Sequence, residues 1–118
     1  MASEKITMYA EKQHELEEIK EGIEKVFYEN MLGTDFVGEV LRELGETKTL
    51  LLIWERWYIR TGSYASLTVL LSEFQGYQSA DIISSGGKDN FCSWGAEENF
   101  AKWGEEALRN LGFLVKVR

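Results

Sequence analysis

The 118-residue sequence has no proline, one cysteine and one histidine. Without proline it has no X–Pro bond to isomerise during folding and no proline-rich linker. Cys92 has no second cysteine in the chain with which to form a disulfide, which fits a reducing compartment. Zinc needs about four nitrogen or sulfur ligands, and the spacing of His14 and Cys92 matches no Cys–His nucleophile pattern. We therefore predict no metal, no cofactor and no catalytic residue.

Positive charge is also scarce. Thirteen lysines and arginines stand against twenty acidic residues, which gives a formal net charge of −7. Nucleic-acid binding depends on a basic surface that displaces counterions from phosphates, so we expect no nucleic-acid partner.

No apolar run approaches the roughly 20 residues that span a bilayer, and Met1–Lys5 does not resemble a signal peptide. The sequence predicts a cytoplasmic protein that does not bind membranes.

The composition is that of a globular domain. Hydrophobic residues make up 44% of the chain and charged residues 28%. A chain of this length is typical of one domain and can bury a single hydrophobic core. We expect residues 1–118 to form one domain.

The clearest local pattern runs from Lys48 to Phe74. Two apolar and aromatic segments of about ten residues flank a polar break at Arg60–Ser63, and β-branched and aromatic residues are typical of strands. Gly62 accepts a positive φ without steric cost, as a tight turn requires. The pattern predicts a β-hairpin.

The segments before and after this hairpin supply further elements. Lys5–Tyr9 alternates weakly, as in a short first strand, and apolar residues between Glu11 and Met31 recur at helical spacing. Asp35–Leu44 fits either a strand or a continuation of the helix, and we favour a strand because the hairpin needs neighbours. Tyr77–Ser85 is interpreted as a further strand.

The last third begins with a turn-forming stretch, Ser84–Asn90, which is rich in serine and glycine. Apolar residues from Phe100 to Leu111 then step by three and four, as on one face of a helix that ends at Gly112. Phe113–Arg118 alternates and is interpreted as an optional final strand.

These elements predict an α+β fold of order β-α-β-β-β-β-α. Consecutive strands with short turns favour an antiparallel meander of four to six strands, with two helices packed on one face. The order resembles that of TBP-like folds, a likeness of architecture that implies no function.

Several motifs resemble a family of small bacterial domains, mostly Gram-positive, that is known only as having unknown function. They are Trp54-Glu55-Arg56-Trp57, Ser66-Leu67-Thr68-Val69, Ser84-Ser85-Gly86-Gly87 and Trp94-Gly95-Ala96-Glu97-Glu98-Asn99-Phe100. The resemblance extends over roughly Asp35 to Leu111, and its most specific part is the Gly-Gly loop before the Trp-Gly helix start. It implies a fold and a bacterial cytoplasmic origin, and no activity.

Both faces of the predicted hairpin are apolar. Leu52 and Trp54 have one parity, and Ile53 and Trp57 have the other. In a two-layer fold only one sheet face meets the helices, so something should cover the second face. The candidates are a second copy of the chain, a small apolar ligand in a groove, or the chain's own segments, and we favour a homodimer. The residues proposed for an interface or ligand site are Trp54, Arg56, Trp57, Tyr58, Tyr64, Gly86 and Gly87.

The function that this pattern favours is a non-enzymatic binding module that self-associates through its aromatic strand face. The alternative is a small-ligand-binding protein or enzyme with a pocket between the sheet and the second helix. In that case the Gly86-Gly87 loop would form the rim, and the polar groups would come from Glu55, Arg56, Arg60 and Asp81. The same loop also fits a simple strand-to-helix connection.

Overall fold

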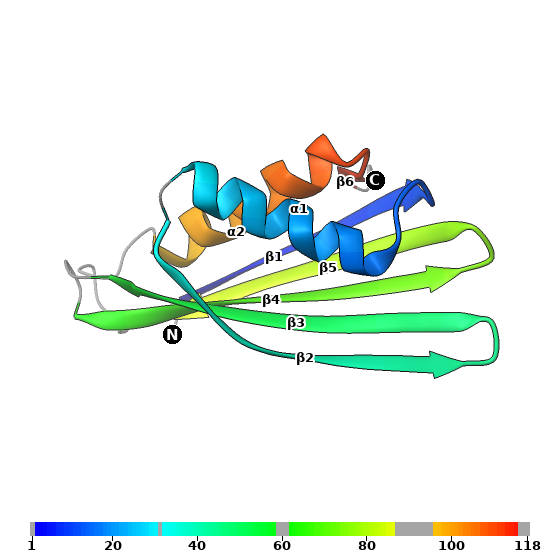
Figure 1. The fold of residues 1–118 in the computed structure, drawn as a ribbon. Coiled ribbons are helices and arrows are strands. Elements are labelled where there is room, and N and C mark those ends of the chain that lie inside the picture. The colour runs from blue at the N-terminus through cyan, green and yellow to red at the C-terminus, as the bar shows by residue number, and fades with distance from the viewer. Residues whose placement is uncertain (1, 31, 59–61, 87–95, 116–118) are drawn as a thin grey trace.

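In the computed structural model, residues 2–30, 32–58, 62–86 and 96–115 are described, and they form one antiparallel sheet and two helices (Figure 1). The elements are β1 (Ala2–Glu11), α1 (Leu16–Glu29), β2 (Thr34–Leu44), β3 (Thr47–Tyr58), β4 (Ser63–Phe74), β5 (Tyr77–Gly86), α2 (Ala96–Asn110) and β6 (Leu114–Val115). The predicted α+β class and the β-α-β-β-β-β-α order are confirmed, with β6 as the optional final strand.

The strands lie in the order β2-β3-β4-β5-β1-β6, and every neighbouring pair is antiparallel. Strands β2 to β5 are the predicted meander. Two of its turns contain only two residues, Gly45-Glu46 and Gln75-Gly76, and both glycines have positive φ, which suits tight hairpin turns. The first strand, β1, pairs along its whole length with β5, from Ala2 opposite Gly86 to Glu11 opposite Tyr77.

The structure resolves the ambiguous segment and moves several boundaries. Asp35–Leu44 is a strand, because β3 would otherwise have an unpaired edge. The first helix starts at Leu16 rather than near Glu11, since Glu11 is the last residue of β1. Strand β5 continues to Gly86, so part of the predicted Ser84–Asn90 loop is strand. The remainder of that loop, and residues 116–118 of the predicted last strand, lie outside the described residues.

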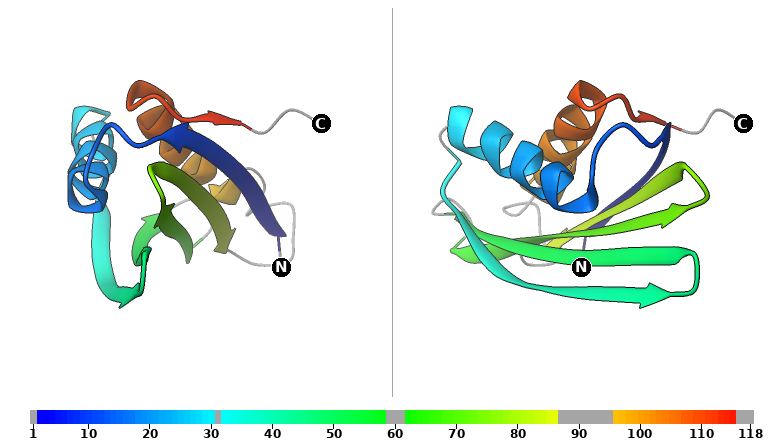
Figure 2. Two further views of the ribbon diagram at one scale, coloured as in Figure 1. Left: turned by 90° about the vertical axis from the view of Figure 1, so that its right-hand side faces the viewer. Right: turned by 45° about the vertical axis from the view of Figure 1, so that its right-hand side comes forward.

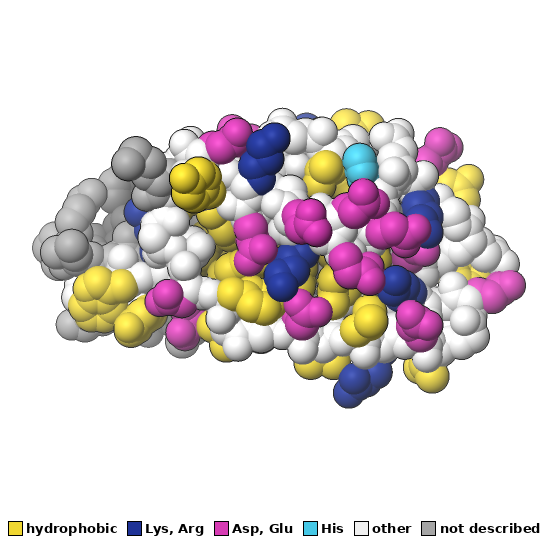
Figure 3. Space-filling model, in the orientation of Figure 1, with side chains coloured by type: hydrophobic (Ala, Val, Ile, Leu, Met, Phe, Trp, Pro, Cys, Tyr) yellow, Lys and Arg dark blue, Asp and Glu magenta, His cyan; other side chains and the backbone are white. Residues whose placement is uncertain are grey.

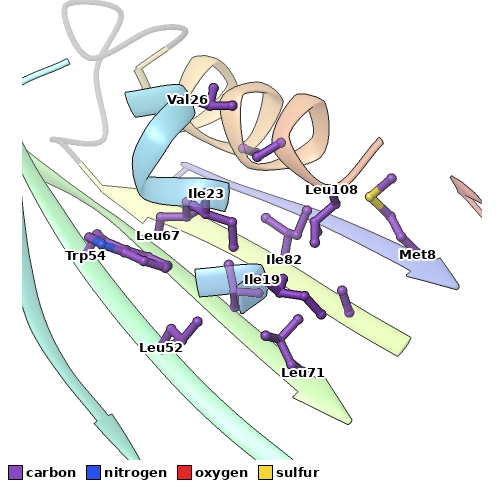
Figure 4. Packing of buried hydrophobic residues seen from close by; sticks show 14 of the residues in the cluster. Met8, Ile19, Ile23, Val26, Leu52, Trp54, Leu67, Leu71, Ile82 and Leu108 are labelled. Carbon is purple, nitrogen blue, oxygen red and sulfur yellow. The ribbon is translucent and has the colours of Figure 1, made fainter. Parts of the chain in front are cut away.

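Both helices cover the same face of the sheet (Figure 2). Helix α1 begins with a capping box, in which the Glu15 backbone N–H donates to the Glu18 carboxylate at 2.8 Å. Its apolar residues are buried, and Figure 4 shows Ile19 and Ile23 pointing toward the sheet. The buried core comprises Met8, Leu16, Ile19, Ile23, Val26, Phe27, Leu50, Leu52, Trp54, Ala65, Leu67, Val69, Leu71, Ala80, Ile82, Phe100, Ala101, Ala107, Leu108 and Phe113.

Gly22 marks where the two helices approach each other. A Cβ at this position would lie 2.8 Å from the Leu111 Cδ1, which is closer than real Cβ contacts. A glycine inside a helix costs up to about 1 kcal/mol relative to alanine. The end of the Leu111 side chain occupies the space that a Cβ at Gly22 would need.

Candidate interaction surface

The two apolar faces of the hairpin have different environments. On β3, Leu50, Leu52 and Trp54 are buried, and Figure 4 shows Leu52 and Trp54 pointing toward the helices. The alternate residues of β3 point to the opposite face, which we call the outer face. Its members on β3 are Thr47, Thr49, Leu51, Ile53, Glu55 and Trp57, and on β4 they are Tyr64, Ser66, Thr68, Leu70, Ser72 and Phe74.

Trp54 belongs to the hydrophobic core. Its side chain is 1% exposed and makes a T-shaped contact with Phe27, with ring centroids 5.5 Å apart. The indole N–H donates to the Glu24 carboxylate at 3.2 Å, so its one polar group is satisfied. Helix α1 therefore shields Trp54, which was one of the predicted interface residues. Trp54 lies on the opposite face of the sheet from Trp57.

On β3 and β4 the centre of the outer face is apolar and free of charge. Leu51 and Leu70 are cross-strand neighbours, and Ile53 lies opposite Thr68. Ile83 on β5 continues this row and is 42% exposed. Among the described residues no helix or strand packs over this face. Charge-poor apolar centres are typical of protein interfaces.

Trp57 and Tyr64 form an aromatic pair at one end of the outer face. Their ring centroids are 4.8 Å apart with a steep interplanar angle of 62°, and each side chain is about half exposed. Both were predicted interface residues, and the structure brings them together. The side chain of Tyr58 lies outside the described residues.

At the other end of the outer face lies a shallow hollow of about 220 Å³. Its walls include the exposed rings of Phe74 and Tyr77, which pair across the β4–β5 hairpin. Its other lining residues are Thr47, Ser72, Glu73, Gln75 and Ser79. This hollow was not predicted from the sequence, although Phe74 and Tyr77, the two aromatic residues that flank Gln75-Gly76, were a usable signal.

Charged residues of the outer face lie around its centre. Asp35 and Glu55 are cross-strand neighbours beside the aromatic pair, whereas Arg42 lies farther along β2 toward the hollow. Asp81 on β5 lies opposite Leu70 and accepts a hydrogen bond from the Thr7 hydroxyl at 2.8 Å. Both signs of charge are therefore present on one face, at separate positions.

The helices carry most of the net negative charge. Helix α1 contains five glutamates against two lysines, and α2 contains four glutamates against one lysine and one arginine. These two elements account for five of the seven net negative charges. Figure 3 shows acidic and basic side chains interspersed over α1 and the adjacent sheet edge. Ion pairs such as Lys20–Glu39, at 2.9 Å, link this layer to β2.

Gly86 has a structural role. A Cβ at this position would lie 2.6 Å from the Tyr64 carbonyl oxygen, because the β4 backbone passes directly beside it. Only glycine fits there without a shift of the backbone. Gly87, also predicted as a ligand or interface residue, lies outside the described residues.

Where the structure describes it, the contact between the sheet and the second helix is closely packed and shows no pocket. The described part of α2 packs directly on the sheet, with Phe100 and Leu108 fully buried and a Cβ at Gly104 only 3.4 Å from Leu67. The proposed polar groups do not converge, since Glu55 lies on the outer face and the adjacent Arg56 points to the other face. Arg60 lies outside the described residues.

A polar cluster joins the β1–α1 connection to the β4–β5 hairpin. Buried Gln78 donates to Glu73 at 2.9 Å and to the His14 carbonyl at 2.8 Å, and the Lys12 ammonium lies 3.0 Å from Glu73. Burial raises the pKa of Glu73, but its hydrogen bonds from Gln78 and Lys12 outweigh this effect. The pKa of Glu73 is therefore lowered from its ordinary value.

The part of the chain that the structure describes contains neither a metal-binding cluster nor a membrane-spanning helix. No group of three or more His, Cys, Asp or Glu side chains is placed to hold a metal ion. None of the helices has the length and apolar character needed to cross a membrane.

Comparison with known proteins shows a family and a distant likeness to solved structures. No curated protein matches the sequence significantly. The crystal structure of LpqN, involved in cell envelope biogenesis of Mycobacterium tuberculosis, is 10% identical with a TM-score of 0.46. The match covers 98% of this chain but only 62% of LpqN, so the chain spans less than two thirds of that protein. The model of DUF6054, a family of unknown function, matches residues 1–112, which confirms the predicted resemblance to a small family of this kind. Because this match extends over nearly the whole sequence, the chain belongs to the DUF6054 family.

Proposed function

We propose that this protein is an interaction module that forms a homodimer through the outer face of its sheet. The observation that supports the proposal is the contrast between the two faces of β3 and β4. One face is covered by the helices, and the other has an apolar centre with aromatic residues at both ends. Full burial of an aliphatic or aromatic side chain contributes about 1.5–3 kcal/mol, so covering this centre would stabilise a complex.

The size of the outer face suits a dimer. Strands β1 to β5 each contain ten to twelve residues. At about 4.8 Å between strands and 3.3 Å per residue, five strands of this length offer roughly 800 Å². Stable protein–protein interfaces bury about 800 Å² on each partner. Two copies packed face to face would thus form an interface of standard size.

A second copy fits the charges better than an acidic or a strongly basic partner does. The outer face carries both basic and acidic residues, among them Lys5, Arg42, Asp35 and Glu55. A surface with both signs can complement itself when two copies meet about a two-fold axis. The net charge of −7 opposes association with nucleic acids or anionic lipids.

Sedimentation velocity across the micromolar range tests the proposal with two matched variants. Ile83→Glu places a charge in the outer face, where the cross-strand neighbour Lys5 compensates it within the monomer. Leu41→Lys is the control, because Leu41 is also 42% exposed but lies on the helix-covered face beside Glu39 and Glu43. We expect Ile83→Glu to raise the dimer dissociation constant about tenfold or more, and Leu41→Lys to leave it unchanged.

Two outcomes would reject the proposal. One is a wild-type protein that remains monomeric throughout this concentration range. The other is a dimer that Leu41→Lys disrupts and Ile83→Glu does not, because that result would assign association to the edge of β2 on the helix side. Circular dichroism of both variants verifies that each is folded.

A further inference from the structure

We infer that the second copy packs with its strands antiparallel to those of the first, about a two-fold axis that runs across the strands. In this arrangement the Trp57–Tyr64 pair of each copy lies over the hollow between Phe74 and Tyr77 of the other. Arg42 of each copy faces Asp35 of the other. The inference rests on the proposed self-association and adds its geometry.

The pairing register arranges the outer face in rows across the sheet. One central row contains Val40, Leu51, Leu70 and Asp81, and the next contains Gly38, Ile53, Thr68 and Ile83. The inferred two-fold axis runs across the strands, between these two rows. When two copies stack about it, each of these rows in one copy lies over the other row in its partner. Leu51 of one copy then lies over Ile53 of the other, and Leu70 lies over Thr68.

The same operation relates the two ends of the face. Trp57 and Tyr64 are the cross-strand pair three rows from the axis in one direction, and Thr47 and Phe74 are the pair three rows away in the other. An exposed aromatic pair is thereby placed over a hollow with aromatic walls. Its volume of about 220 Å³ offers room for part of an aromatic side chain. Aromatic side chains seated in pockets are frequent centres of binding energy.

The charges are complementary under this axis. Arg42 and Asp35 are both on β2, in rows at equal distances on opposite sides of the axis. Each Arg42 therefore faces the partner's Asp35, with Glu55 adjacent on β3. In the same way Lys5 lies above the partner's Thr7, whose hydroxyl is hydrogen-bonded to Asp81. Opposite charges across an interface fix the orientation of the partners.

The other symmetric stacking, about an axis parallel to the strands between β3 and β4, lacks these matches. It would place Arg42 over Ser79 and Asp35 over Ser85, so the charges would have no opposite partner. It would also place each aromatic pair over the other copy's aromatic pair and leave the hollow empty. In that stacking, Asp81 of one copy would lie over Val40 of the other and diagonally next to its Arg42. An Asp81→Arg variant therefore discriminates between the two axes.

Charge reversal tests the axis, with the dissociation constant measured by sedimentation velocity. Arg42→Glu should raise the constant about tenfold, since it replaces two attractive contacts per dimer by two repulsive ones. Adding Asp35→Arg should recover most of the wild-type affinity, whereas adding Asp81→Arg should not. Recovery by Asp81→Arg and not by Asp35→Arg would overturn the inference in favour of the parallel axis.

A double-mutant cycle tests the aromatic contact independently. Tyr64→Ala and Phe74→Ala are far apart within one chain but lie over each other across the inferred interface, so their effects on the dissociation constant should be non-additive. Leu114→Ala provides the control, because Leu114 is exposed on β6, far from Tyr64, and should combine additively with Tyr64→Ala. Additive effects for both pairs would overturn the inference.

These results separate the two proposals. If Ile83→Glu weakens the dimer but the Arg42→Glu and Asp35→Arg pair shows no rescue, the outer face is the interface and the inferred axis is wrong. If Ile83→Glu and Arg42→Glu both leave association unchanged, the outer face is not the interface and both proposals fail.

Discussion

Trp54 and Glu24 form a hydrogen bond across the interface between the sheet and α1, from the indole nitrogen to a carboxylate oxygen at 3.2 Å. Trp57, three residues later on the same strand, lies on the outer face with 48% of its surface exposed. Two tryptophans of one strand thus differ in environment because they have opposite parity. One is part of the core, and the other belongs to the proposed interface.

This difference predicts unequal effects on stability. Trp54→Ala should lower the free energy of unfolding by about 3–5 kcal/mol, because it leaves a cavity and removes the partner of Glu24. Trp57→Ala is the matched control and should cost less than about 1 kcal/mol. Urea unfolding, at a protein concentration where both variants are monomeric, measures the two values. Equal losses would contradict the burial of Trp54 on the helix side.

The cluster around Glu73 predicts a pH dependence. Its pKa is lowered in the folded protein, so the stabilisation that it provides is present above its ordinary pKa of 4.5 and is lost as the pH falls through the lower folded pKa. Between about pH 6 and pH 3 the wild type should lose more stability than Glu73→Gln, which cannot titrate at this position. Chemical unfolding at a series of pH values gives the comparison.

Lys12→Met provides the companion measurement. Lys12 donates to Glu73 at 3.0 Å, and this contact helps to lower the Glu73 pKa. In the Lys12→Met background, the substitution Glu73→Gln should therefore change the pH dependence of stability less than it does in the wild type. If the free energy of unfolding changes with pH by the same amount in wild type, Glu73→Gln and Lys12→Met, this cluster does not contribute to acid sensitivity.

Substitution of Gly86 should destabilise the sheet. Gly86→Ala should destabilise the protein by about 2 kcal/mol or more, because the new methyl group would collide with the β4 backbone at Tyr64 and Ala65. Gly33→Ala is the control, since a Cβ there meets nothing within 4 Å. Thermal unfolding should show a lower midpoint for the first variant and a midpoint close to wild type for the second. Equal midpoints would refute the close approach of the strands.

Self-association predicts that thermal stability depends on protein concentration. A dimer that dissociates on unfolding is stabilised by mass action, so the unfolding midpoint should rise as the protein concentration increases. Ile83→Glu should reduce this dependence, and Leu41→Lys should retain it. A wild-type midpoint that is independent of concentration across the micromolar range would contradict the proposed dimer.

The sequence by itself was sufficient for the local elements. The turn at Gly62 between two runs of strand-forming residues predicted the hairpin, and the stripe through Ile19, Ile23 and Val26 predicted α1. These signals depend on neighbours at most four residues apart, so they are visible in the chain alone. Segment order and helix amphipathicity also predicted that both helices pack on one face.

Only the tertiary structure decided which apolar parity of β3 is buried and which contributes to the outer face. Leu52 and Ile53 are equally apolar in the sequence, so the pattern does not indicate which of them is buried. That depends on the face of the sheet on which α1 packs. The pairing of β1 with β5, the contact of Gly22 with Leu111, and the placement of Asp35 and Arg42 in rows flanking the apolar centre likewise join positions through the fold. Such relationships arise from packing and strand register between segments distant in the chain, and local hydrophobic patterns carry no information about them.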